Sequence, residues 1–334
     1  MDALIRPRRD RTVPRAAIAI LRAQTGIMLV YAGQVKLTPD WLRGEPLGLW
    51  LRERTEGTWI APLFQQDWLI VLACWAVIAL HVLGAPLLLQ RRTRLPVFLL
   101  YCAFHGANAF FFNTGIFPWM TTAASTIFLA PDWPSRLAAR LSGRPRPAPS
   151  AASAAHRLSP LAMLAMTLWI AVQLALPIRG ALFKSETRWS GDGHRFSWRM
   201  QIYEREAVGA FVVTDRTSGD SWRVDPDSFL TPRQTDKMIV RSDLILQFAH
   251  HLADIWTETG REVSVHAEIC KSLNGRPCQI FIDPEVDLSG VQRNLLAADP
   301  WVLPLETPHW GVADNRWPKV IAAVGDGVMA RGPD

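Results

Sequence analysis

The chain has 334 residues, of which 49% are hydrophobic and 20% are charged, and its formal net charge is +6. This composition excludes disorder, a collagen-like fibre and a small disulfide scaffold. The mean hydropathy of +0.08 is too mild for a protein buried in lipid from end to end and too high for a wholly water-soluble enzyme. We therefore expect one membrane part and one water-exposed part. The 15 Trp against 3 Tyr agree, because tryptophan favours membrane interfaces.

Five apolar segments predict membrane helices. The second and third are long enough to cross a hydrocarbon core of about 30 Å at roughly 1.5 Å per residue. The fourth and fifth are shorter, as is typical of tilted or re-entrant helices. The five segments are approximately 16–35, 68–89, 95–112, 117–130 and 161–176.

Arginine placement predicts the orientation of these helices. Arginines gather in the regions 6–15, 91–94 and 136–157, which five spans place on one side of the membrane. The positive-inside rule makes that side the cytoplasm. We therefore expect an integral protein of the cell or inner membrane with a cytoplasmic N-terminus. The Pro/Ala/Ser-rich stretch 141–157 is expected to be a flexible cytoplasmic linker.

The residue pattern changes after Ile178. Three segments, 201–215, 262–270 and 278–283, alternate apolar and polar residues and are rich in β-branched side chains, which predicts strands. Apolar residues at helical spacing predict one helix in the range 232–259, with a break near Arg241.

The expected fold class is an α-helical multi-span membrane bundle of about five helices, joined to a C-terminal mostly-β extracytoplasmic domain with an inserted helix. The bundle is assigned to residues 1–178 and the outer domain to 179–310, with a tail over 311–334. The net positive charge is explained by topology, so no nucleic-acid partner is expected.

Two of the four cysteines bracket a predicted hairpin turn. Cys270 and Cys278 flank the sequence KSLNGRP. In an oxidising compartment they can be joined across the two strands. The alternative is a pair of free thiols facing opposite ways, and the sequence leaves both open. Cys74 and Cys102 lie inside predicted helices as apolar fillers. No cysteine or histidine spacing indicates a metal.

Polar side chains inside membrane segments are costly, so each is a candidate functional residue. Lys36 stands at the end of the first helix, either as a lysine that reaches toward the interface or as one kept neutral by burial so that it acts as a base. His81 lies in the middle of the second helix. His105 and Asn108 are three residues apart on one face of the third, where they can grip a planar carbonyl compound or bond a neighbouring helix.

Three separated blocks resemble the vitamin K-dependent gamma-glutamyl carboxylase family, whose membrane part is called the horizontally transferred transmembrane (HTTM) domain. The first block is LRAQTGIMLVYAGQVKLTPDWLRGEPL. The second is FHGANAFFFNTGIFPWM with IFLAPDWPSRL. The third combines RFSWRMQIYE, DPDSFLTPRQTDKM and SLNGRPCQIFIDPEVDL. The blocks occur in the family's order, and the resemblance covers about residues 14–305.

The resemblance implies a membrane lyase and quinone epoxidase. The expected cofactor is reduced vitamin K or a related quinol, with O2 and CO2 as co-substrates and no metal. Lys36 matches the family's base, which deprotonates the quinol so that its oxidation drives carboxylation of glutamate in a protein or peptide. The expected quinone-binding residues are His105, Asn108, Phe117, Trp198, Met200 and His81.

The chain departs from the family in one respect. Family members carry further helices before the lysine-bearing one, with an Asn-His-Tyr motif whose histidine assists the quinone chemistry. No such motif occurs here, so a short member is expected, with His81 or His105 as a substitute. The second hypothesis is a non-catalytic quinone- or lipid-binding membrane subunit whose missing helices come from a partner. The expected partners are the lipid bilayer, a quinone and a glutamate-containing peptide.

Overall fold

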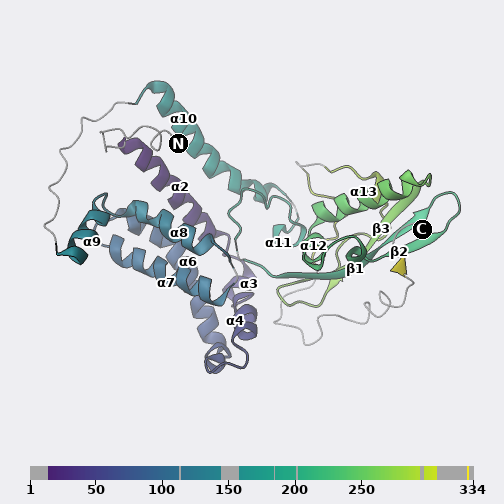
Figure 1. Ribbon diagram of the computed structural model, residues 1–334, viewed down its shortest axis with the longest axis horizontal. Coiled ribbons are helices and arrows are strands. Elements are labelled where there is room, and N and C mark those ends of the chain that lie inside the picture. The colour runs from purple at the N-terminus through teal and green to yellow at the C-terminus, as the bar shows by residue number, and fades with distance from the viewer. Residues whose placement is uncertain are drawn as a thin grey trace. The chain divides into compact units, whose positions relative to one another are not determined.

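The computed structural model describes residues 14–112, 114–143, 158–183, 185–200, 202–293, 297–306 and 329–330. The chain forms two compact units (Figure 1). The first, here called the membrane unit, comprises 1–37 and 75–177, and the second, the sheet unit, comprises 38–74 and 178–334. Most of the predicted linker 141–157 and of the tail 311–334 lies outside the described residues.

Helices form at all five positions where the sequence predicts membrane helices. Three of them are long and apolar enough to cross a membrane: α2, α6, and α10 together with the 3-10 turn η2 that follows it. The other two, α7 and α8, fall short, and the nine residues of α8 extend only about 14 Å. The count of five spans therefore stays a prediction. The helices are α2 (Arg15–Gln34), α6 (Asp67–Leu89), α7 (Arg94–Phe111), α8 (Phe117–Ser125) with η1 (Thr126–Phe128), α9 (Trp133–Ser142), and α10 (Pro160–Ala175) with η2 (Leu176–Leu182).

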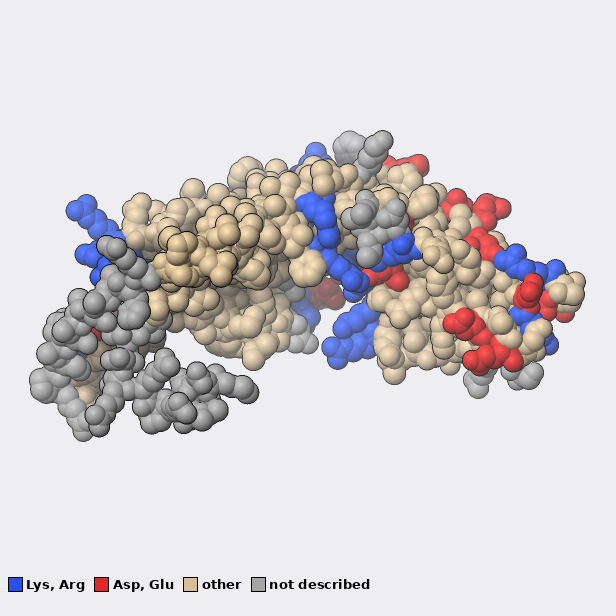
Figure 2. Space-filling view, turned by 90° about the horizontal axis from the view of Figure 1, so that it is seen from above, with Lys and Arg blue, Asp and Glu red and all other residues tan. Residues whose placement is uncertain are grey.

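The surface of these helices is apolar. Figure 2 shows one face of the chain, on which the membrane helices are covered almost entirely by uncharged residues, whereas charged side chains gather over the sheet unit. Leu83, Leu99 and Leu168 are each more than half exposed. Lipid tails cover such side chains without cost, so the exposed leucines fit helices in a bilayer.

Close helix packing in the membrane unit depends on two glycines. A Cβ atom on Gly33 of α2 would lie 2.8 Å from the Cβ of His81 on α6. A Cβ on Gly84 of α6 would lie 2.8 Å from the hydroxyl oxygen of Tyr101 on α7. That hydroxyl donates a hydrogen bond to the backbone carbonyl of Leu80 at 2.8 Å. The small residues thus bring the polar side chains of three helices together.

The segment between the first two long helices is folded and belongs to the sheet unit. It contains α3 (Pro39–Leu42), α4 (Leu47–Thr55) and α5 (Ala61–Phe64). The Thr38 hydroxyl accepts a hydrogen bond from the Trp41 backbone and so caps α3. The buried Trp41 indole donates to the carbonyl of Cys74 at 3.1 Å.

The sheet unit contains a five-stranded sheet in the order β4-β3-β1-β2-β5. Its long central pair, β1 and β3, is antiparallel, with Phe211 opposite Ala267. The short β5 pairs with β2 in the parallel direction. The strands are β1 (Arg205–Asp215), β2 (Ser221–Val224), β3 (Val263–Leu273), β4 (Gln279–Ile280) and β5 (Met329–Ala330).

One amphipathic helix packs on this sheet and completes its core. The helix α13 (Ser242–Glu258) buries the apolar stripe that its sequence predicts, with Ile245, Leu252 and Trp256 fully buried. The predicted break is confirmed, because the extended Arg241 separates α13 from α12 (Pro232–Met238). The remaining elements are α11 (Thr187–Ser190), η3 (Pro226–Ser228) and η4 (Leu288–Gly290).

A disulfide joins Cys270 of β3 to Cys278, with the two Cα atoms 5.5 Å apart. This confirms the first of the two alternatives that the sequence left open. The pairing of Cys270 with Ile280 places the two cysteines at the mouth of the β3–β4 hairpin.

Candidate functional site

Lys36 lies just beyond the end of α2 and is buried, with 5% of its surface exposed. Its ammonium nitrogen Nζ donates a hydrogen bond to the carbonyl of Ala32 at 2.8 Å. Gly33 lets α2 pack closely against α6 at His81, and Lys36 follows Gly33 by about one helical turn. Lys36 therefore lies close enough to interact electrostatically with the His81 ring. The side chain is therefore directed into the membrane unit and not into water.

His81 is equally buried. Its Nδ1 lies 2.8 Å from the carbonyl of Val77. Since a carbonyl oxygen only accepts, Nδ1 carries the hydrogen, and Nε2 of the neutral ring is an acceptor. The ring is in edge contact with Phe104 at 5.0 Å and Tyr101 at 5.9 Å between centroids.

His105 is the least satisfied polar side chain of this group. It is 4% exposed and stacks on Tyr101 at 6.1 Å. Its Nε2 is buried and has no hydrogen-bond partner in the described part of the chain. A buried polar atom without a partner costs about 1–3 kcal/mol and needs an explanation. We call Lys36, His81, Tyr101, Phe104 and His105 the membrane cluster.

The other two candidates of the membrane unit are placed less centrally. The amide of Asn108 donates to the carbonyl of Phe104 in its own helix at 2.9 Å. Phe117 is the first residue of α8 and is half-buried. The structure thus brings Lys36, His81 and His105 together, whereas the amide NH2 of Asn108 is occupied within α7.

Trp198 and Met200 belong to the sheet unit, where they flank Arg199 in an irregular loop. Both side chains are half-buried. Trp198 has a φ of +54°, a left-handed conformation that a bulky residue rarely adopts. The loop is therefore held by its surroundings, a feature that is concentrated at functional sites.

Beside this loop lies a group of cations around a tyrosine–histidine pair. The Tyr203 hydroxyl is 2.8 Å from Nδ1 of His194. Burial raises the pKa of Tyr203. Burial also lowers the pKa of His194, and the charges of Arg205, Arg241 and Arg199 lower it further. Both groups are thus neutral near pH 7, and the hydroxyl donates to Nδ1.

Two of these arginines lack a carboxylate partner. Arg241 is paired with Asp243 at 2.9 Å. Among the residues that the structure describes, Arg199 and Arg205 form no ion pair, and the buried Nε of Arg199 has no hydrogen-bond partner. The guanidinium of Arg205 stacks on the Tyr203 ring at 4.3 Å. We call Arg199, Arg205, Tyr203 and His194 the arginine cluster, which is suited to bind a carboxylate.

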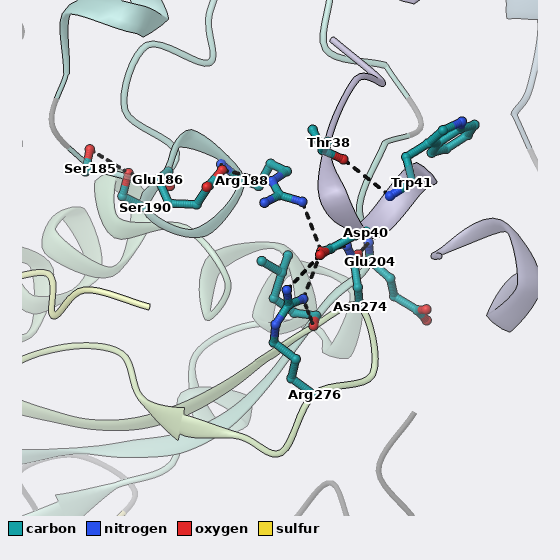
Figure 3. A network of polar contacts seen from close by, with 11 residues as sticks. Thr38, Asp40, Trp41, Ser185, Glu186, Arg188, Ser190, Glu204, Asn274 and Arg276 are labelled. Atoms are coloured by element: carbon teal, nitrogen blue, oxygen red, sulfur yellow. Dashed lines mark hydrogen bonds and ion pairs between the residues drawn. The ribbon is translucent and has the colours of Figure 1, made fainter. Parts of the chain in front are cut away.

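Asp40 is a buried residue that the sequence analysis did not single out. It receives two hydrogen bonds from Arg276, at 2.8 and 2.9 Å, one from Asn274 at 2.7 Å, and an ion pair from Arg188 at 2.9 Å (Figure 3). Burial opposes its ionisation, but the bonds and charges of Arg276 and Arg188 outweigh burial and lower the pKa of Asp40 to about 2.

A sequence signal for this network existed. Asp40 lies in the PDW of the first block, and Asn274 and Arg276 lie in the SLNGRP of the third. Both blocks carry a resemblance to the same family, so a contact between them was a reasonable expectation. The network holds α3 on the β3–β4 turn and is too fully paired to bind a ligand.

Within the described residues, no group of three or more His, Cys, Asp or Glu side chains is arranged to hold a metal ion.

Comparison with protein families agrees with both units. The family model of the HTTM domain matches residues 1–133, and that of the lumenal domain of vitamin K-dependent gamma-carboxylase matches residues 158–308. No solved structure matches the chain significantly. With three helices able to cross a membrane and a lumenal-type domain, the chain is an integral membrane protein. It belongs to the vitamin K-dependent gamma-carboxylase family.

Proposed function

We propose that this protein is a membrane carboxylase that binds reduced vitamin K or a related quinol at the membrane cluster and carboxylates peptide glutamate. The observation that carries the proposal is the buried Nε2 of His105, which has no hydrogen-bond partner among the described residues, near His81, on which Lys36 also acts electrostatically, in a chain of this family.

The membrane cluster supplies aromatic and hydrogen-bonding groups of the kinds that bind a quinol. Tyr101 and Phe104 offer aromatic faces for a planar ring. His105 Nε2 is a buried hydrogen-bonding group without a partner among the described residues, and it would bond a ring oxygen. The chemistry that a bound vitamin K hydroquinone supplies is oxidation by O2 coupled to proton removal from glutamate.

Lys36 and His81 are assigned to proton handling. Lys36 Nζ accepts a proton from a quinol hydroxyl, which requires the amine in its neutral form. His81 keeps its proton on Nδ1, which donates to the carbonyl of Val77, so the Nε2 of the neutral ring remains an acceptor. Because the side chains of Lys36, His81 and His105 are each 5% exposed or less, water is kept away from the transferred proton.

The arginine cluster is assigned to the substrate. Arg199 and Arg205 form no ion pair within the described residues, although the charge of Glu186 acts on Arg199 and that of Asp243 acts on Arg205. Peptide glutamate supplies the missing carboxylate, and CO2 adds to the same side chain. Trp198 and Met200 flank Arg199 in the chain and are assigned to the contact with the bound quinol or substrate.

A second function, a non-catalytic quinone- or lipid-binding subunit, is favoured by one observation. Lys36 already donates to a helix-end carbonyl, as a purely structural lysine does. If the protein is an enzyme, removal of the Lys36 amine abolishes quinol epoxidation. If it is a binding subunit, the wild type itself binds quinone but shows no epoxidation.

Purified full-length protein in detergent, incubated with reduced naphthoquinone and O2, decides between them. Lys36→Arg keeps the charge but cannot release its proton, so epoxide formation falls to background while thermal stability and quinone binding stay near wild type. His105→Phe keeps the stack on Tyr101 and weakens quinone binding. Epoxidation that survives in Lys36→Arg refutes the role of Lys36. Binding without epoxidation in the wild type establishes the second function.

We also propose that the N-terminus is cytoplasmic and the sheet unit extracytoplasmic, on the strength of the arginine-rich regions. Fusion of a phosphatase that is active only outside the cytoplasm should give activity after residue 300 and none after residue 150. The reverse pattern would refute the orientation.

A further inference from the structure

The helix α9 is amphipathic and buries none of its side chains. Trp133, Leu137 and Leu141 recur every four residues and therefore lie on one face. Leu137 is 48% exposed and Leu141 is 81% exposed. An apolar stripe on a folded helix requires a cover, and nothing within the described part of the membrane unit buries these leucines.

The edge of this stripe is basic. Arg136 and Arg140 are one turn apart and exposed. Arg136 is paired with Asp132 at 2.6 Å, whereas Arg140 forms no ion pair with another described residue. Lysines and arginines at the edge of an apolar stripe are typical of helices that lie in a membrane interface.

Other arginines gather at the same end of the membrane unit. Arg22 of α2 donates to the carbonyls of Ile127 and Leu129, only a few residues before α9 begins. Arg22 also interacts electrostatically with Arg94, the first residue of α7. The exposed Arg91 precedes it in the turn after α6. This end therefore carries an excess of positive charge next to helices that are apolar enough to be embedded in lipid.

We propose that α9 lies on the surface of the bilayer and binds anionic lipids. Leu137 and Leu141 enter the boundary between headgroups and acyl chains, and Arg136 and Arg140 contact lipid phosphates. Lipid is favoured over a protein partner because Arg22 of the apolar helix α2 binds the residues just before α9 and because the charge that flanks the stripe is complementary to an anionic leaflet. The proposal does not depend on catalysis.

The test uses the full chain in nanodiscs, with Cys74 and Cys102 replaced by Ala and the Cys270–Cys278 disulfide kept oxidised. A single cysteine at Leu137→Cys or Leu141→Cys carries a bimane fluorophore. Phosphatidylglycerol with brominated acyl chains should quench it severalfold more strongly than it quenches bimane at the matched control Ser135→Cys. Ser135 lies on the opposite face of the same helix.

The contribution of charge is measured by replacing brominated phosphatidylglycerol with brominated phosphatidylcholine. The ratio of lipid-bound to unbound α9 should then fall about fivefold for each unpaired arginine near the surface. Arg140→Gln should therefore weaken the preference for phosphatidylglycerol more than Arg136→Gln, because Asp132 already neutralises Arg136.

Three results would overturn the proposal. Equal quenching at positions 135 and 141 would show that the helix has no lipid-facing side. Quenching independent of lipid charge would remove the phosphate contact. Bimane that is shielded from water but not quenched by brominated lipid would show that a protein surface, such as a second copy of the chain, covers the stripe.

Discussion

Asp40 and Arg276 stand 236 positions apart in the sequence and form a doubly hydrogen-bonded ion pair, with nitrogen–oxygen distances of 2.8 and 2.9 Å. Both side chains are buried, and Arg188 places a second guanidinium 2.9 Å from the same carboxylate. One aspartate thus holds two cations that water does not reach. The segment after Lys36 is thereby attached to the β3–β4 turn within the sheet unit.

Asp40→Asn should destabilise the sheet unit severely. The amide is uncharged, so the buried Arg276 would lose the carboxylate that it binds, and the buried Arg188 would keep its ion pair with Glu186 but lose the one with Asp40, at a cost of about 3–5 kcal/mol. The measurement is thermal unfolding of the full chain in detergent. The control is Asp67→Asn, which removes an exposed partner of Arg52 and should change the unfolding temperature little. Equal effects of the two substitutions would contradict the structural role of Asp40.

Lys271→Met should change the pH dependence of stability. Lys271 is fully buried, and its Nζ donates to the carbonyls of Trp189 and Val240 and lies 3.6 Å from the centre of the Phe281 ring. Burial, and to a lesser extent the charge of Arg205, lowers the pKa of Lys271 well below its usual value.

Between the lowered pKa of the folded state and the unfolded-state pKa of about 10.4, the unfolded chain binds a proton that the folded chain lacks. The free energy of unfolding of the wild type should therefore rise with pH, by up to about 1.4 kcal/mol per pH unit, until the unfolded lysine also loses its proton. Denaturant unfolding at pH 7, 8 and 9 should show this rise in the wild type and in the exposed control Lys237→Met. Lys271→Met should lack it, and identical slopes in all three proteins would refute the prediction.

Gly33→Ala should separate two membrane helices. Its Cβ would lie 2.8 Å from the Cβ of His81 and 2.9 Å from a methyl group of Val82, so α2 and α6 must move apart. Such overpacking costs about 1–3 kcal/mol. A Cβ atom at Gly26 in the same helix would have no neighbouring side chain or helix within 4 Å. Gly26→Ala should therefore only stabilise the helix slightly, through the higher helix propensity of alanine. Thermal unfolding in detergent compares them, and a Gly33→Ala protein as stable as Gly26→Ala would rule out the close contact.

The disulfide should be visible by mass and by stability. Alkylation of denatured protein without reductant should modify two of the four cysteines, and all four after reduction. The double substitution Cys270→Ser with Cys278→Ser should lower the free energy of unfolding by about 2–3 kcal/mol, because the unfolded chain regains the freedom of the closed loop. Reductant should destabilise the wild type to the same extent and leave the double variant unchanged. Four alkylated cysteines without reductant would exclude the bond.

Local patterns predicted most of the elements because they report local physics. Apolar runs such as 68–89 require a helix in lipid, and the periodicity of α13 together with its break at Arg241 follows from spacing alone. The segment 36–67 lies outside the five predicted helices, yet it contains three short ones. Its short helices have few residues each, and their stability comes from contacts such as that of Trp41 with Cys74, which are distant in sequence.

The candidate site shows the same division. Lys36, His81 and His105 were predicted as candidate functional residues because each is a polar side chain within an apolar segment, where its burial is costly. That these three residues share one cluster follows from Gly33 and Gly84, whose lack of a side chain lets α2, α6 and α7 approach closely. The arginine cluster was missed because arginines in a water-exposed domain are usually solvated, and only packing shows which of them lack a carboxylate.

The sequence by itself determined the positions of the long apolar helices, the change to strands after residue 178 and the resemblance to one family, since these depend on composition and short-range order. Only the tertiary structure decided which distant side chains meet. Asp40 forms an ion pair with Arg276, Cys270 forms a disulfide with Cys278, and the Nε2 of His105 has no hydrogen-bond partner among the described residues. These outcomes depend on strand register and on the distance between packed elements, which no local pattern encodes.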